Sequence, residues 1–436
     1  MEQFFVRGGR PLHGTIRVSG SKNGCLGIMA AALLVKGKTT LHNVPDIRDI
    51  YTMVEMLRQV GAEVKFLGNG SVCIDATGFD RTQAPESLVR AMRASFYVFG
   101  PMLARLGRAE VSQPGGCEIG ARPIDFHLKG MQALGAKVEV NGGIVRGEAA
   151  RLHGAQLYLD FPSAGATTHL MITSCLAPGK STIENAATEP EISDLAAFLN
   201  HLGARIDGAG SDTINIDGVE ELKTDMEFSI LPDRIEAGTF ACAAAITRGD
   251  VVLDRVVPSH LLPVLVKLQD MGVEVLPLDT SEPEQLGRLR VRATARTQCV
   301  DILAMPHPGF PTDLQQPIAS LLSVSQGTAT VTDQVFENRF KYAGELARMG
   351  ANIRVEGRSA FITGVEKLCG ASVLATDLRA GAALVVAALA ANGETIVSGI
   401  DHIDRGYSGL VEKLRGAGAD IVRADQTEPR TFFRAV

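Results

Sequence analysis

Six copies of one short pattern restrict the fold of this 436-residue chain more than any other sequence feature. The pattern is Leu-x-x-x-Gly-[Ala/Val]-x-[Val/Ile], as in LRQVGAEV, with Met replacing Leu in one copy. It is typical of the last turn of an amphipathic helix, a glycine cap and the start of a strand. The copies occupy 57–64, 131–138, 199–206, 268–275, 346–353 and 414–421.

A second element precedes each copy: an Ala-rich apolar helix that ends near a glycine, followed by a short β-branched strand. The glycine of the first pattern follows 23 to 28 residues later. The repeat is therefore helix–strand–loop–helix–strand–strand. We expect the first helices, apolar nearly all round, to be buried, and the two-faced second helices to face solvent. A chain of this length is too long to fold around a single hydrophobic core. The six repeats therefore predict two domains of three repeats each, with helices inside and sheets around them.

The second repeat is the longest, and its extra residues fall in PGGCEIGARP (114–123). Most lone cysteines are small buried hydrophobic residues. Insertions in a repeat family, however, tend to lie on a binding face, and long loops are often functional. Cys117 is therefore a candidate functional thiol, and the glycines around it are candidate hinges.

Composition excludes several classes of protein. The net charge of −6 argues against a general nucleic-acid binder. Seven scattered cysteines without a C-x-x-C motif indicate neither a disulfide framework nor a zinc site. The start of the chain lacks a signal-peptide pattern, and no segment reaches membrane-spanning length. We therefore expect a cytoplasmic protein without a nucleic-acid or membrane partner.

Polar residues gather where the helices are expected to begin, as in Ser21-Lys22-Asn23 and Thr312-Asp313. Helix N-termini suit anions. Capping is the simpler interpretation of Asp233, Thr312 and Thr376. It does not explain cations at these ends, which predict an anionic ligand. By contrast, we expect Arg81, Arg105, Arg108 and the run 288–296 to be solvated.

Ten motifs stand out along the chain: SGSKN (19–23), MRAS (92–95), PGGCEIGARPID (114–125), SAGAT (163–167), ENAATEPEI (184–192), LPDRIEAGTF (231–240), PHPGFPTD (306–313), VFENRF (335–340), ATDLRA (375–380) and HIDRGY (402–407). In these motifs, and in their order from residue 1 to about 425, the chain resembles the enolpyruvyl transferases. The resemblance implies two inside-out α/β domains, each of three βαβαββ repeats with buried helices. It places one domain at 22–234, with a cysteine-bearing lid at about 112–125, and the other at 1–21 plus 235–436. The chain departs from the family where Gly24-Cys25-Leu26-Gly27 replaces Ala-rich sequence.

The resemblance implies a reaction: the enolpyruvyl group of phosphoenolpyruvate moves to the 3′-hydroxyl of UDP-N-acetylglucosamine, with loss of phosphate. The path is addition–elimination through a tetrahedral intermediate, at the first committed step of peptidoglycan precursor synthesis. No metal or organic cofactor is implied. Two alternatives stay open, namely 5-enolpyruvylshikimate-3-phosphate synthase, which lacks a catalytic cysteine in this loop, and a non-catalytic paralogue that binds UDP-N-acetylglucosamine.

The matching motifs also imply roles for single residues. Cys117 would donate the proton to C3 of phosphoenolpyruvate, and Asp313 would act as a base near the 3′-hydroxyl or bind that hydroxyl. Phe161 stands where many relatives have a basic residue, which puts one diphosphate contact in doubt. The phosphoenolpyruvate cradle would be Lys22, Arg122 and Arg405, with Arg93 and Arg379 also near substrate anions. Contacts to the sugar or intermediate would come from Asn23, Phe336 and Asp377. Contacts to the nucleotide sugar would come from Arg122, Pro123, Ile124, Asp125, Phe126, Ser163, Ala164, Gly165 and Val335.

Overall fold

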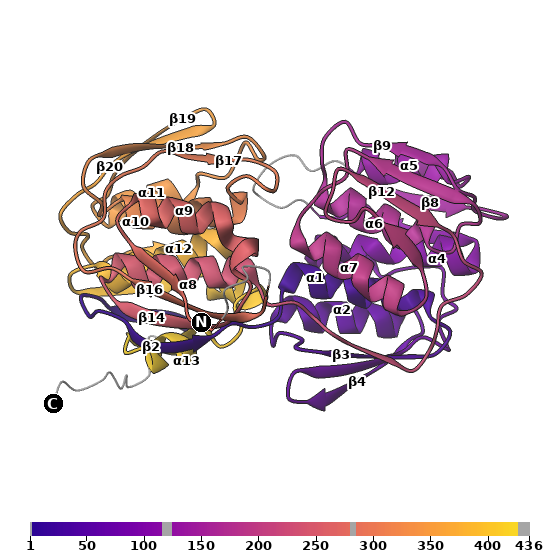
Figure 1. Ribbon diagram of the computed structural model, residues 1–436, viewed down its shortest axis with the longest axis horizontal. Helices are drawn as coiled ribbons and strands as arrows, with labels where there is room; N and C mark the ends of the chain where they lie inside the picture. The colour runs from indigo at the N-terminus through magenta and orange to yellow at the C-terminus, as the bar shows by residue number, and fades with distance from the viewer. Residues whose placement is uncertain (1, 116–123, 280–284, 426–436) are drawn as a thin grey trace. The chain divides into compact units, whose positions relative to one another are not determined.

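The chain divides into two compact units in the computed structural model, which describes residues 2–115, 124–279 and 285–425 (Figure 1). The middle unit holds the described residues from 20 to 231. The terminal unit holds those from 2 to 19 and from 232 to 425. The chain passes between them at Ser19–Gly20 and at Leu231–Pro232. These positions lie a few residues before the boundaries that the resemblance implies.

The middle unit contains three of the repeats. Its elements are α1 (Lys22–Ala31), η1 (Ala32–Leu34), β3 (Lys38–His42), α2 (Arg48–Gln59), β4 (Glu63–Gly68), β5 (Ser71–Asp75), α3 (Glu86–Ala91), η2 (Arg93–Val98), α4 (Phe99–Leu106), β6 (Arg108–Ser112), α5 (Asp125–Ala133), β7 (Lys137–Asn141), β8 (Ile144–Glu148), β9 (Gln156–Tyr158), α6 (Ala164–Ser174), β10 (Lys180–Glu184), α7 (Pro190–His201), β11 (Arg205–Asp207), β12 (Thr213–Asp217) and β13 (Met226–Ser229).

The terminal unit contains the other three repeats and both ends of the described chain. Its elements are β1 (Glu2–Arg7), β2 (His13–Arg17), α8 (Arg234–Ile246), β14 (Asp250–Val256), η3 (Pro258–Leu261), α9 (Leu262–Asp270), β15 (Glu274–Pro277), β16 (Gly287–Arg292), β17 (Ile302–Ala304), η4 (Thr312–Leu314), α10 (Gln315–Leu322), β18 (Thr328–Asp333), α11 (Tyr342–Arg348), β19 (Asn352–Glu356), β20 (Ser359–Thr363), β21 (Ser372–Leu374), α12 (Leu378–Ala390), β22 (Glu394–Ser398), η5 (Ile400–Arg405), α13 (Leu410–Gly416) and β23 (Asp420–Asp425).

Each repeat forms one small sheet with a common strand order. Five sheets have four strands, for example β17-β18-β20-β19, in which β17 pairs parallel with β18 and the other pairs are antiparallel. The sixth, β6-β8-β7, has three strands, with a single parallel bridge from Gln83 to Glu110 in place of the first. The prediction of one repeated α/β module is therefore confirmed.

Three sheets borrow a strand from a distant part of the chain, which the sequence did not reveal. The first repeat takes β13 from the end of the third, since β13 pairs parallel with β3. The fourth takes β2 beside β14, and the sixth takes β1 between β22 and β23. These pairings tie each unit together across the full length of its sequence.

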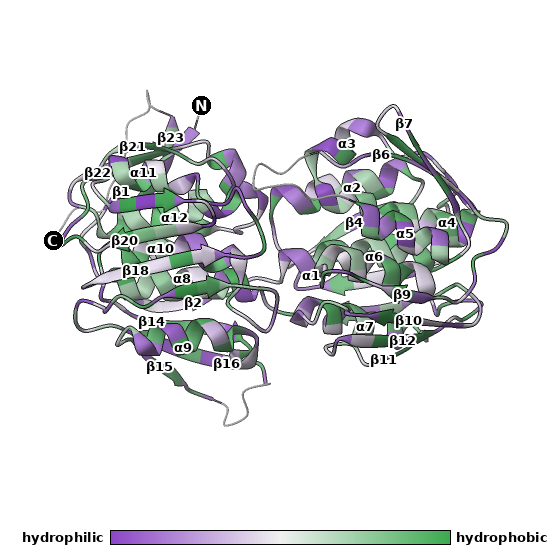
Figure 2. Cartoon of the chain, turned by 90° about the horizontal axis from the view of Figure 1, so that it is seen from above, coloured by the Kyte–Doolittle hydropathy of each residue, from purple (hydrophilic) through white to green (hydrophobic). Residues whose placement is uncertain are grey.

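The apolar first helices are buried, as predicted. In the terminal unit α8, α10 and α12 pack against one another, and every residue of α12 from Arg379 to Leu389 is buried. Figure 2 shows hydrophobic residues along α8 and α12. In the middle unit α1 and α6 are buried over most of their length, and α4 over its first five residues. Each unit has its own hydrophobic core.

The repeated glycines end the second helices as the sequence predicts. All six have φ between +89° and +107°, a left-handed conformation that glycine adopts without steric cost. In each copy the amide after the glycine donates to the carbonyl of the first residue of the pattern, as Ala62 N does to Leu57 O at 3.0 Å. This is the Schellman motif, which satisfies carbonyls at a helix end.

Close packing explains the glycines in the unusual start of α1. A β-carbon at Gly24 would lie 2.9 Å from Leu231 Cδ2, and one at Gly27 would lie 3.2 Å from Thr168 Cγ2. Cys25 between them is fully buried. The segment Gly24–Gly27 therefore lets α1 approach its neighbours within the middle unit.

Two arginines predicted to be solvated are instead structural, and that prediction is wrong for them. Arg105 Nη1 donates to the carbonyls of Leu33, Val35 and Ala76 at 2.8–3.0 Å. Arg296 similarly donates to four carbonyls of the terminal unit. Guanidinium groups here satisfy backbone acceptors where helices and strands end.

Candidate active site

The predicted site residues are distributed over both units, and each unit is described by itself. Cys117, Arg122 and Pro123 lie outside the described residues, as does segment 116–123 of the predicted lid. Gly115 is described: a β-carbon there would lie 2.5 Å from the carbonyl oxygen of Arg90, so this glycine is needed for close backbone approach.

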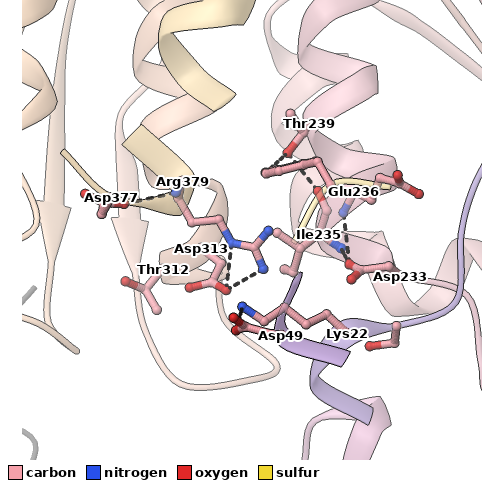
Figure 3. A network of polar contacts seen from close by, with 12 residues as sticks. Lys22, Asp49, Asp233, Ile235, Glu236, Thr239, Thr312, Asp313, Asp377 and Arg379 are labelled. Atoms are coloured by element: carbon pink, nitrogen blue, oxygen red, sulfur yellow. Dashed lines mark hydrogen bonds and ion pairs between the residues drawn. The ribbon is translucent and has the colours of Figure 1, made fainter. Parts of the chain in front are cut away.

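Lys22 is the first residue of α1 and is buried, with 8% of its surface exposed. Its Nζ lies 2.7 Å from Oδ2 of Asp49, a buried carboxylate in the first turn of α2 (Figure 3). The neighbouring Asn23 is exposed. The chain thus supplies a carboxylate for a cation that we had interpreted as needing an external anion, so this charge argument alone does not require a ligand.

The predicted nucleotide-sugar segments of the middle unit converge at the start of α6. Ser163 caps this helix, accepting from Ala166 N at 3.3 Å. A β-carbon at Gly165 would lie 3.6 Å from the hydroxyl of Tyr97 and 3.7 Å from the ring of His127. His127 belongs to α5, which begins after Ile124 with Asp125 and Phe126, and Tyr97 belongs to η2, which begins at Arg93. Ala164 in the first turn is exposed.

A buried pair of histidines, which the sequence analysis missed, joins α5 to α6: His127 lies in α5 and His169 in α6. His127 Nδ1 is 2.9 Å from His169 Nδ1, and Gly100 N donates to His169 Nε2 at 2.9 Å. Burial, together with the nearby His127, holds the pKa of His169 well below its usual range, so the ring is neutral. The proton of His169 must then be on Nδ1, because Nε2 accepts. His127 Nδ1 is therefore an acceptor.

Asp313, in the terminal unit, is contacted by two arginine side chains. Its Oδ1 lies 2.5 Å from Arg339 Nη2. Its Oδ2 accepts from Arg379 Nη2 and Nε at 3.0 and 3.1 Å (Figure 3). Burial favours a higher pKa for this carboxyl group, but the two guanidinium charges and their hydrogen bonds hold its pKa well below the usual range. Asp313 is therefore a firmly ionised carboxylate.

Helix caps in the terminal unit agree with the sequence only in part. Asp233 caps α8, accepting from Ile235 N and Glu236 N, as predicted. The prediction is wrong for the two threonines: Asp377, not Thr376, caps α12, and Thr312 bonds to a carboxylate instead of a helix end. An aspartate outcompetes its threonine neighbour at α12 because its charged oxygen accepts two amide protons near the positive end of the helix.

Asp333 connects the remaining predicted contacts. Its Oδ1 accepts from Val335 N at 2.8 Å and from Phe336 N at 2.9 Å. The Arg339 guanidinium carbon lies 5.1 Å from the centre of the Phe336 ring, and that of Arg379 lies 5.3 Å from the centre of the Tyr407 ring. The structure thus links Val335, Phe336, Asp313 and Arg379 in one polar network.

Arg405 belongs to a short helix that packs against α12, the helix that carries Arg379. It is the last residue of this short helix, η5. A β-carbon at Gly381 in α12 would lie 2.6 Å from Ile403 Cγ1, so this glycine allows the two helices to approach closely. The start of α12, with Asp377 and Arg379, and η5 with Arg405 are therefore neighbours.

Three described cysteines are inert structural residues. Cys25, Cys175 and Cys242 are fully buried, and burial raises the pKa of Cys175 and of Cys242 to about 12. A thiol of that pKa forms little of the reactive thiolate.

Within residues 2–115, 124–279 and 285–425, no group of three or more His, Cys, Asp or Glu side chains has an arrangement that could hold a metal ion. The helices of these same ranges include none with the length and apolar character needed to cross a membrane.

The model of one known family matches almost the whole chain. It is described as EPSP synthase (3-phosphoshikimate 1-carboxyvinyltransferase) and matches residues 6–414. Among solved structures, the enolpyruvyl transferase NikO from Streptomyces tendae superposes with a TM-score of 0.86 at 28% identity, covering 97% of this chain and 98% of that one. An EPSP synthase from Acinetobacter baumannii gives 0.75 at 17% identity, covering 98% and 100%, and shows the shared fold.

Curated relatives are closer in sequence. UDP-N-acetylglucosamine 1-carboxyvinyltransferase 2 of Carboxydothermus hydrogenoformans is 52% identical over 97% of this chain and 99% of its own length. UDP-N-acetylglucosamine 1-carboxyvinyltransferase 1 of Caldanaerobacter subterraneus subsp. tengcongensis is 50% identical over 97% and 99%. Together with the repeats, the buried helices and the family model, these matches establish that the chain belongs to the enolpyruvyl transferase family, in the group of the UDP-N-acetylglucosamine 1-carboxyvinyltransferases.

Proposed function

We propose that this chain transfers the enolpyruvyl group of phosphoenolpyruvate to the 3′-hydroxyl of UDP-N-acetylglucosamine and releases phosphate, in the cytoplasm, as the first committed step of peptidoglycan precursor synthesis. The observation that carries the proposal is about 50% identity to enzymes named for this reaction over 97% of the chain. Both substrates of this reaction are anionic, and each unit has a buried cation at a helix start, Lys22 in α1 and Arg379 in α12.

The reaction needs a proton donor, because the enol ether of phosphoenolpyruvate is a poor electrophile. We assign that role to Cys117, which would protonate C3 as the 3′-oxygen attacks C2. Loss of phosphate from the tetrahedral intermediate and return of a C3 proton to the Cys117 sulfur then restore the double bond. The proton of the 3′-hydroxyl group leaves with the departing phosphate, as hydrogen phosphate. We assign Lys22, Arg122 and Arg405 to phosphoenolpyruvate, Arg93 to a substrate anion, and the starts of α5 and α6 to the nucleotide sugar.

We assign Asp313 to binding and orienting the 3′-hydroxyl. A carboxylate whose pKa is held well below the usual range by two guanidinium groups takes up a proton poorly, so it is a weak general base. It remains a strong hydrogen-bond acceptor, able to fix the direction of the hydroxyl lone pair toward C2.

Phosphate release from phosphoenolpyruvate, measured with each of two acceptors, tests this proposal against its alternatives. We expect release with UDP-N-acetylglucosamine and none with shikimate 3-phosphate. Release only with shikimate 3-phosphate would identify the sister synthase, and binding of UDP-N-acetylglucosamine without release would identify a non-catalytic paralogue.

The Cys117→Ala variant tests the proton donor. We expect it to keep the circular dichroism spectrum of the wild-type chain but to lose turnover, because Cys117 is the only thiol that we assign to the reaction. The matched control is Cys369→Ala, which removes an exposed thiol and should leave turnover unchanged. Near-wild-type rates in Cys117→Ala would refute the assigned role.

A further inference from the structure

Asp333 is a fully buried carboxylate at the end of β18. With none of its surface exposed, it has no area to offer a substrate. It nevertheless holds two segments that carry proposed substrate contacts. One oxygen, Oδ1, fixes the turn 333–336 through the amides of Val335 and Phe336. The other, Oδ2, lies 2.6 Å from the hydroxyl oxygen of Thr312, the residue before Asp313.

The direction of the hydrogen bonds through Thr312 is fixed by chemistry. Arg339 Nη1 lies 2.7 Å from the Thr312 hydroxyl oxygen, and a guanidinium group can only donate. The single hydroxyl proton of Thr312 must therefore go to Asp333, which accepts it. Hydrogen bonds are thus donated from Arg339 to Thr312 and from Thr312 to Asp333. The other terminal nitrogen of the same guanidinium group, Nη2, donates to Asp313.

We propose that Asp333 is a positioning residue for the transfer: it holds the turn that carries Val335 and Phe336 and, through Thr312, the arginine that orients Asp313. This inference rests on the proposed function. Arg339 is 4% exposed, so its position depends on these internal partners and not on solvent. A loss of the Asp333–Thr312 contact would remove one of the contacts that fix Arg339, and so weaken the hold of Arg339 on Asp313.

Two variants break this contact from opposite sides while they keep side-chain shape. In Asp333→Asn the remaining carbonyl oxygen can still accept from the turn amides, but the new NH₂ group can only donate, so the hydroxyl proton of Thr312 loses its acceptor. Thr312→Val removes the hydroxyl group, whereas Thr312→Ser keeps it. The matched control is Thr332→Val, because Thr332 precedes Asp333 but its hydroxyl lies 2.7 Å from Ser359, outside the network.

The test is steady-state kinetics of the full-length variants with both substrates. We expect Asp333→Asn and Thr312→Val each to lower kcat/KM for UDP-N-acetylglucosamine about 10-fold or more, the size expected for losing one hydrogen bond to a charged group. The KM for phosphoenolpyruvate should stay within about twofold, since Lys22, which is assigned to that substrate, pairs with Asp49 and not with Asp333 or Thr312. Thr312→Ser and Thr332→Val should resemble the wild type.

The double variant Asp333→Asn/Thr312→Val tests whether the two residues affect the kinetics through the same contact. We expect it to be no worse than the poorer single variant, because both changes remove the same contact. Losses that multiply, a Thr312→Ser variant as impaired as Thr312→Val, or a folded Thr312→Val with wild-type kinetics would each overturn the positioning role. If Asp333→Asn does not fold, the comparison of Thr312→Val with Thr312→Ser decides the question alone.

A failure of the proposed function gives a different result. A wild-type chain without transfer activity refutes that function and the positioning role with it. An active wild type with insensitive variants refutes the positioning role only.

Discussion

Asp194, on α7 of the middle unit, illustrates at the scale of a single residue how burial couples a side chain to stability. It is largely buried, and its Oδ2 accepts from Leu231 N at 3.3 Å, at the point where the chain leaves this unit. Burial raises the pKa of this carboxyl group from 3.8 to about 7, with the Leu231 hydrogen bond opposing the shift.

The raised pKa predicts the sign of a pH effect. Between pH 3.8 and about 7 the folded chain holds a proton that the unfolded chain has released. Unfolding therefore becomes easier as pH rises through this window, by roughly 1.4 kcal/mol for each unit of pKa shift. Asp194→Asn should remove this loss, so its stability relative to the wild type should grow from pH 5 to pH 8.

Urea unfolding at several pH values measures this effect. Asp207→Asn, which changes an exposed aspartate in the same unit, serves as the control and should not alter the pH dependence. A relative stability of Asp194→Asn that is flat or falls as pH rises would show that the wild-type carboxyl group is not protonated in the fold.

The sequence predicts the cations of the candidate site better than the groups that hold them. Lys22 and Arg379 stand out because a positive charge at a helix start is unfavourable. Their pairings do not stand out, even though Asp313 itself does: Asp49 belongs to a different helix of the repeat from Lys22, and Asp313 belongs to a different repeat from Arg379. Arg339, Asp333 and the pair His127–His169 were missed for the same reason, because no local spacing marks a contact made between distant segments.

At the scale of the element, local chemistry makes the helix ends predictable. A glycine after a leucine-bearing turn is enough to predict a Schellman cap, because the requirement for positive φ is local. The caps at α12 and η4 were less predictable, since neighbouring Thr and Asp residues compete for the same role and tertiary hydrogen bonds decide between them.

Two glycines of one helix test this view of the helix end. Gly344 lies inside α11 and Gly350 follows its end at φ +90°, and a β-carbon at either would meet nothing within 4 Å. Gly344→Ala should stabilise the chain by up to about 1 kcal/mol, through helix propensity. Gly350→Ala should destabilise it by about 1–2 kcal/mol, because alanine is strained in the left-handed region.

The free energies of unfolding of these two variants, measured by urea denaturation, should move in opposite directions. Equal effects, or a stabilising Gly350→Ala, would contradict the assignment of the backbone conformation at the helix end.

At the scale of the whole molecule, periodicity predicts six modules in two groups but not how the chain closes them. The sheets of the first, fourth and sixth repeats each receive a strand from far along the sequence: β13, β2 and β1. Short apolar strands carry no local signal of their partner, because register and pairing are set by the sheet they join. The proposed function of the whole chain follows from its family, and it makes one definite claim: the product is the 3′-enolpyruvyl ether of UDP-N-acetylglucosamine.

The most direct test of that product follows phosphoenolpyruvate labelled with carbon-13 in its vinyl group, incubated with the wild-type chain and UDP-N-acetylglucosamine. The account predicts that the label appears in an enol ether on the 3′-oxygen of the sugar, with one phosphate released for each ether formed. Phosphate released without a labelled nucleotide sugar, or a label attached at another hydroxyl, would contradict it.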